Sequence, residues 1–118
     1  MHVKPEAAVR ADELLEAHTV WWGHTVLLRL DGELDLATVQ IVDRAVSLAL
    51  AGQPRALCLD LTGLVFCDMT GLRALQRLTH RVGAAHTTLH LTDLHPNLHR
   101  TLARLETVVP WAPRVLQE

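Results

Sequence analysis

The chain has 118 residues, of which 49% are hydrophobic and 20% charged, and its formal net charge is −2. This balance is typical of one folded domain and argues against a disordered chain, and the slightly negative charge argues against nucleic-acid binding, which normally needs a basic stripe. No apolar run approaches the roughly 20 residues of a membrane-spanning helix, and the N-terminus lacks a secretory pattern. We therefore expect a cytoplasmic protein with no direct membrane insertion.

Two apolar runs near the N-terminus predict a hairpin. Residues 19–22 and 25–30 read as strands, and the Gly-His pair at 23–24 forms a two-residue loop that suits a tight turn. Successive side chains of a strand point to opposite faces of the sheet. We therefore expect one of the adjacent Trp21 and Trp22 to lie in the core and the other at the surface.

A helix and a buried strand are expected next. From residue 36 to 51, valines and leucines recur every three or four positions, which predicts an amphipathic helix. Asp35 is placed to cap the start of this helix and Gly52 to end it. Residues 56–61 alternate leucines with smaller residues, which indicates a largely buried strand.

The second half of the chain continues to alternate helices with strands. The helix that opens after Asp68 gathers its leucines on one face and should stop at Gly83. Residues 87–92 alternate as a strand does, and Pro96 suits the first turn of a last helix. Residues 108–111 are placed to add one more short strand.

The predicted fold is α/β, with the order β-β-α-β-α-β-α and an optional final strand. Strands that alternate with helices favour a mixed, mostly parallel sheet, to which the opening hairpin adds an antiparallel part. We expect an N-terminal arm or short helix at 1–17, one domain at 18–112 and a C-terminal tail at 113–118.

Motifs for catalysis or metal binding are missing from the sequence. Cys58 and Cys67 are too few and too far apart for a metal knuckle or a redox pair, and both read as buried small hydrophobes. His95 and His99 have a helical spacing that suits zinc, but the glutamate of the zinc motif does not follow His95. With no nucleophile–base pair and no phosphate-cradling loop, we expect no enzyme activity, no cofactor and no metal.

The combined motifs resemble a known family. They are Gly-Glu-Leu-Asp at 32–35, Leu-Asp-Leu at 59–61 and Asp-Met-Thr-Gly at 68–71. Together they resemble the STAS domain of bacterial anti-sigma factor antagonists, and the resemblance covers residues 19–109. It implies the STAS fold and a non-enzymatic regulatory module that docks on a histidine-kinase-like anti-sigma factor.

In the family that the chain resembles, the partner kinase phosphorylates the serine directly after the motif aspartate, and this breaks the complex. Here the aspartate is Asp68, and Met69 occupies the position of the serine. Methionine cannot be phosphorylated, so the resemblance implies either constitutive binding or a switch moved to Thr70. A phosphate of about −1.5 to −2 charges beside Asp68 would oppose burial at an interface.

The candidate site lies at the start of the second helix, where unpaired N–H groups and the helix dipole favour anions. Helix capping by Asp68 and Thr70 is the simpler interpretation, and it is compatible with partner contact. An alternative function is that of a scaffold subunit in a larger signalling or lipid-transport assembly. A third function, the sensing of a small ligand at the helix start, would need more glycines or a lysine there. The sequence does not decide whether the protein forms a homo-oligomer. The predicted partner-binding residues are Asp35, Asp68, Met69, Thr70, Gly71 and Leu72.

Overall fold

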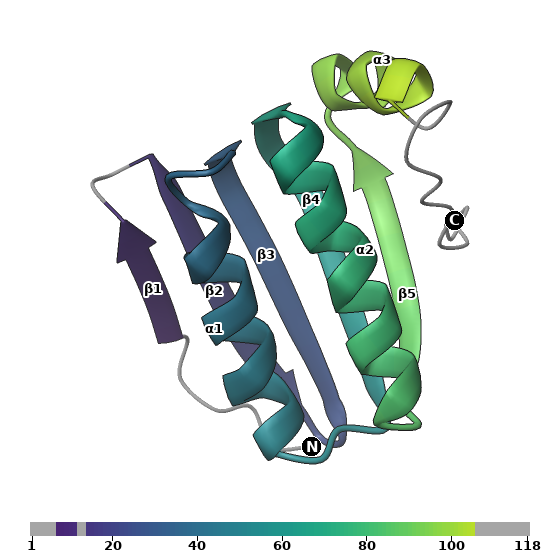
Figure 1. Cartoon of the computed structure of the whole chain (residues 1–118). Helices are drawn as coiled ribbons and strands as arrows, with labels where there is room; N and C mark the ends of the chain where they lie inside the picture. Colours follow the sequence, from purple (N-terminus) through teal and green to yellow (C-terminus); the bar gives the residue numbers. More distant parts are fainter. Residues whose placement is uncertain (1–6, 12–13, 106–118) are drawn as a thin grey trace.

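The computed structural model describes residues 7–11 and 14–105. These residues form a single five-stranded sheet with the spatial order β1-β2-β3-β4-β5, and three helices (Figure 1). The elements along the chain are β1 (Ala7–Ala11), β2 (Leu15–Trp22), β3 (Thr25–Leu34), α1 (Val39–Ala51), β4 (Ala56–Cys67), α2 (Met69–Ala84), β5 (Thr88–Leu94) and α3 (Pro96–Leu105).

The sheet is antiparallel at one side and parallel at the other. β1, β2 and β3 pair antiparallel, whereas β3, β4 and β5 pair parallel. The predicted two-residue hairpin joins β2 to β3, and its Gly23 has a φ of +62°, which glycine adopts without strain. The two parallel crossovers place α1 and α2 side by side on one face of the sheet (Figure 1). The predicted α/β fold class is therefore confirmed.

The N-terminal lead-in differs from the sequence prediction. Residues 7–11 form β1 rather than an arm or a short helix, and β2 begins at Leu15, so the expected boundary after residue 17 falls inside β2. The local pattern at 7–11 is weak, and the open edge of β2 supplies the hydrogen-bond partners that fix it as a strand. The strand expected at 108–111 and the tail at 113–118 lie outside the described residues.

β4 is twice as long as the sequence pattern indicated. It continues past Leu61, where the predicted strand ends, to Cys67. Its pairing with β3 shifts register along this stretch, and the bulges break the apolar alternation by which a strand is recognised. The extension matters because it aligns the carboxyl ends of β3 and β4.

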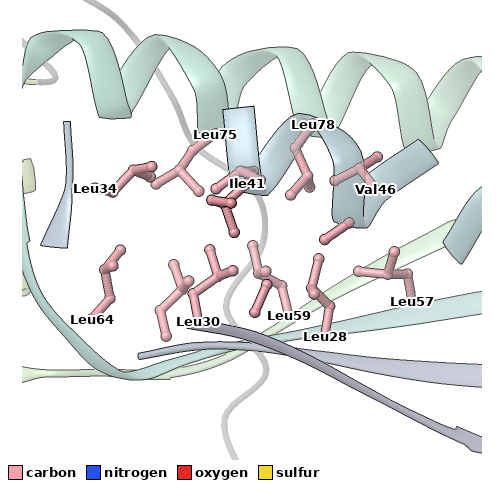
Figure 2. Packing of buried hydrophobic residues seen from close by; sticks show 14 of the residues in the cluster. Leu28, Leu30, Leu34, Ile41, Val46, Leu57, Leu59, Leu64, Leu75 and Leu78 are labelled. Carbon is pink, nitrogen blue, oxygen red and sulfur yellow. The ribbon is translucent and has the colours of Figure 1, made fainter. Parts of the chain in front are cut away.

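Leucines of the sheet and of α2 form the core together with Ile41, Val42 and Val46 of α1 (Figure 2). Leu28, Leu30 and Leu59 rise from the sheet toward Leu75 and Leu78 of α2, and all five side chains are buried. The predicted apolar face of α2 is thus confirmed. Full burial of one such side chain contributes about 1.5–3 kcal/mol, so this layer fixes α2 firmly above the strand ends.

Candidate functional site

The two sequence motifs meet where β3 and β4 end. Leu34 and Cys67 are aligned partners in the parallel pairing, so Asp35 and Asp68 leave the sheet at neighbouring positions. The backbone N–H of Asp68 donates to the Leu34 carbonyl across 3.2 Å. Both aspartates are partly exposed. Residues 33 positions apart along the chain are therefore held together by the sheet itself.

Asp68 caps the start of α2. Its backbone is extended, with φ −97° and ψ −171°, and its Oδ1 accepts a hydrogen bond of 2.8 Å from the Gly71 N–H. This is the geometry in which a cap side chain satisfies one of the unpaired N–H groups of a helix start, and it confirms the capping interpretation for Asp68. The capped turn places Met69 and Thr70 at the first two helical positions, and both are partly exposed.

Gly71 and Leu72 serve the packing of α2 instead of its surface. A Cβ at position 71 would lie 2.5 Å from the Leu34 carbonyl oxygen and 2.9 Å from Cys67 Sγ, so only glycine lets the helix approach the strand ends this closely. Leu72 is fully buried. Neither residue presents a side chain to a partner, which does not fit the prediction that both make partner contacts.

The turn that bears Asp35 is held by a buried threonine that sequence reasoning missed. α1 begins at Val39 with Thr38 as its N-cap, so Asp35 does not cap this helix as expected. Asp35 Oδ1 instead accepts a 3.0 Å hydrogen bond from the Ala37 N–H. This bond forms a local turn, so the helix begins later in the chain than predicted. The Thr38 hydroxyl donates a 2.8 Å hydrogen bond to the Glu33 carbonyl, and this bond holds the turn in place.

Large apolar side chains are exposed around these turns. Leu36 is 74% exposed, and Phe66, which is the register partner of Glu33, is 46% exposed. Sequence reasoning missed the exposure of Leu36, because it placed this leucine at the start of the first helix, whereas α1 begins only at Val39. We call this surface the strand-end face and define it by Asp35, Leu36, Phe66, Asp68, Met69 and Thr70.

His95, which directly precedes α3, has a structural role. His95 Nδ1 accepts a 3.1 Å bond from the Asn97 N–H, as a cap residue does. Within the described ranges, no group of three or more His, Cys, Asp or Glu side chains is placed to hold a metal ion.

Cys67 is buried as expected, whereas Cys58 is only half-buried. Burial raises the pKa of the Cys58 thiol, and at Cys67 burial followed by the charge of Asp68 raises the pKa to about 12. At such a site the thiol binds its proton more tightly in the folded state than in the unfolded state. The stability that the thiol contributes is therefore complete at a pH below its pKa in the unfolded chain, and it is lost as the pH rises toward its pKa in the folded protein.

Alkaline pH should therefore weaken the fold through Cys67. From about pH 9 upward, the free energy of unfolding should fall by up to about 1.4 kcal/mol per pH unit from this group alone. The chain has no tyrosine, so few other groups titrate there. Urea unfolding at several pH values should give a flatter profile for Cys67→Ala than for Cys58→Ala. Equal profiles would contradict the assignment to Cys67.

A comparison with protein-family models matches residues 17–108 to the STAS domain. The chain belongs to the STAS domain family. No curated protein matches the sequence of this STAS chain. The matched range contains both sheet-end motifs and all of α1 and α2.

Solved structures show the same fold at low identity. This STAS domain is similar to an anti-sigma factor antagonist from Mycobacterium paratuberculosis, with a TM-score of 0.70, 20% identity, and 93% and 92% of the two chains covered. It is also similar to the anti-sigma factor antagonist SpoIIAA in its unphosphorylated form, with a TM-score of 0.59, 18% identity, and 97% and 88% covered. A third match, SLC26A9, has a TM-score of 0.55 and 16% identity; 80% of this chain is covered, but only 18% of that protein.

No helix in the described part of the chain is both long enough and apolar enough to span a membrane.

Proposed function

We propose that this STAS domain is a non-enzymatic binding module that docks through its strand-end face on a kinase-type anti-sigma factor in the cytoplasm. The observation that carries the proposal is the meeting of the two motif turns around the start of α2, with the Asp68 N–H bonded to the Leu34 carbonyl. The full-length fold similarity to two anti-sigma factor antagonists supports the partner class.

The chemistry of the strand-end face suits a protein partner. Protein interfaces combine an apolar centre with a polar rim. Leu36 and Phe66 supply exposed apolar area, while Asp35 and Asp68 supply negative charge beside it. Such a surface favours a partner that offers an apolar hollow flanked by lysines or arginines, because opposite charges speed association and select the partner.

Met69 makes the proposed binding constitutive. It occupies the first position of α2, where the resemblance places a phosphoacceptor serine, and its thioether cannot accept phosphate. Thr70 is the nearest hydroxyl, one position further along the helix. A phosphate there would meet the helix N-terminus but also the Asp68 carboxylate. We propose that the wild type stays bound whether or not ATP is present.

Met69→Ser should restore a phosphorylation switch. Incubated with a kinase-type anti-sigma factor, the variant should take up one phosphate and leave the complex on addition of ATP, whereas the wild type and Met69→Leu should stay bound. Intact-mass spectrometry and size-exclusion chromatography measure the two effects. Phosphothreonine at position 70 of the wild type, with loss of the complex, would contradict constitutive binding. The absence of any complex with such kinases would favour the scaffold role instead.

A further inference from the structure

Charge is divided between the helices and the rest of the domain. Within the described residues, the three helices hold a single acid, Asp43, and six arginines: Arg44, Arg73, Arg77, Arg81, Arg100 and Arg104. The strands and turns between residues 14 and 95 show the opposite balance, with seven acids and two arginines. α1 and α2 lie side by side on one face of the sheet (Figure 1), so this face is basic although the chain as a whole has a net charge of −2.

The arginines of α2 form a stripe along the junction with α1. Arg73, Arg77 and Arg81 are spaced four residues apart, so they follow one side of the helix over about 12 Å. Arg77 Nη2 lies 3.3 Å from Asp43 Oδ2. Arg81 donates a 3.1 Å hydrogen bond to the Asp43 carbonyl and a 2.6 Å hydrogen bond to the Ser47 hydroxyl. We call Arg73, Arg77 and Arg81 the basic stripe, in which α1 holds the last two guanidinium groups in place.

Most of the charge of the basic stripe has no counter-charge. Asp43 neutralises Arg77, but the two groups that bind Arg81 are a carbonyl and a hydroxyl, which carry no net charge. Arg73 is exposed and forms no ion pair with the described residues, and neither α1 nor α2 has an acid in its first turn. Arginines that are oriented but not neutralised favour an anionic partner, because binding costs them less conformational entropy.

The size and spacing of the basic stripe favour an acidic segment of a protein over other anions. Lipid-binding clusters typically contain about four to eight basic residues, and DNA-binding proteins commonly contact about six to ten phosphates. The stripe is smaller, and its Arg77 is already paired. An acidic helix, in contrast, presents carboxylates at the same four-residue spacing, and one carboxylate can accept two hydrogen bonds from one guanidinium group.

We propose that the basic stripe is a docking surface for an acidic helical segment of a partner protein, which lies along the junction of α1 and α2. Arg73 supplies a charge that no group of the domain neutralises, and Arg81 supplies one that α1 has already oriented. The stripe begins one helical turn after Met69 of the strand-end face but has the opposite charge. The proposal stands independently of the proposed function, because its test needs no anti-sigma factor.

A pair of synthetic helical peptides tests the proposal. One peptide carries glutamates at three successive i, i+4 positions, and the other carries glutamines at the same positions. In an NMR titration, the glutamate peptide should shift the backbone amide signals of α1 and α2 and should bind at least about ten-fold more tightly than the glutamine peptide. Added salt should weaken the binding, because the Debye length falls from about 10 Å at 0.1 M to about 3 Å at 1 M.

Two charge reversals locate the contact. Arg73→Glu should weaken binding of the glutamate peptide by about ten-fold or more, because repulsion replaces attraction. Arg55→Glu is the matched control, since Arg55 is exposed and precedes β4, outside the helices. It changes the net charge by the same amount and should bind the peptide as the wild type does. Circular dichroism of both variants shows whether they are folded.

Three results would overturn the proposal. The first is the absence of any amide shift in α1 and α2 at about 1 mM glutamate peptide. The second is an equal loss of affinity in Arg73→Glu and Arg55→Glu, which would mean that the peptide responds to net charge alone. The third is binding of phosphatidylglycerol vesicles or a DNA duplex that depends on Arg73 while the peptide does not bind, which would assign the basic stripe to a lipid or nucleic-acid partner.

Discussion

Replacing Gly71 with alanine should lower the free energy of unfolding by about 2–3 kcal/mol, although the change adds a single methyl group. The new Cβ would lie 2.5 Å from the Leu34 carbonyl oxygen, and backbone atoms cannot yield as a flexible side chain does. That carbonyl also accepts the Asp68 N–H, so any shift that relieves the clash strains the contact that joins the two motif turns. The same substitution should therefore weaken both the fold and the strand-end face.

Gly83→Ala is the matched control within the same helix. A Cβ at position 83 would meet no atom within 4 Å, so alanine should stabilise the protein by about 0.4–1 kcal/mol through the lower entropy of the unfolded chain. Urea denaturation of the wild type and both variants measures the two changes. If Gly71→Ala unfolds at the wild-type midpoint, the close approach of α2 to the strand ends does not limit stability, and the glycine of the motif needs another explanation.

The elements that sequence reasoning predicted well are those decided by local pattern. α2 shows a clear helical period, and its predicted face is buried from Leu72 to Val82. The hairpin was predicted from its two-residue loop. β1 and the second half of β4 were missed because pairing decides them: β1 depends on the open edge of β2, and the bulges in β4 exist only against β3.

The candidate site was likewise predicted only in part, and local pattern decides which part. The cap by Asp68 could be predicted, because the cap residue precedes a strongly periodic helix. The cap by Asp35 was wrong: the side chain of Asp35 forms a local turn, and the buried Thr38 takes the N-cap position. The exposure of Phe66 could not be predicted, since the bulges that turn it outward depend on pairing between distant strands.

Leu36→Asp should abolish most partner binding while leaving the fold intact. Leu36 is 74% exposed and adds little to the core, so the free energy of unfolding should change by less than about 0.5 kcal/mol. If Leu36 is the apolar anchor of the strand-end face, an aspartate there should weaken the complex with a kinase-type anti-sigma factor by about 30-fold or more. Isothermal titration with the purified partner measures the change.

Two further variants separate the anchor from its surroundings. Leu48→Asp makes the same chemical change at a leucine that is 62% exposed on α1 and lies outside the strand-end face, so its binding should match that of the wild type. Asp68→Asn keeps an oxygen that can cap α2 but removes the charge, and it should mainly slow association with a basic partner. Equal losses from Leu36→Asp and Leu48→Asp would place the contact on α1 rather than at the strand ends. If Leu36→Asp binds the partner as tightly as the wild type does, Leu36 is not the apolar anchor and recognition depends on the charged groups. Charged groups alone are a weaker basis for a complex that phosphorylation cannot break.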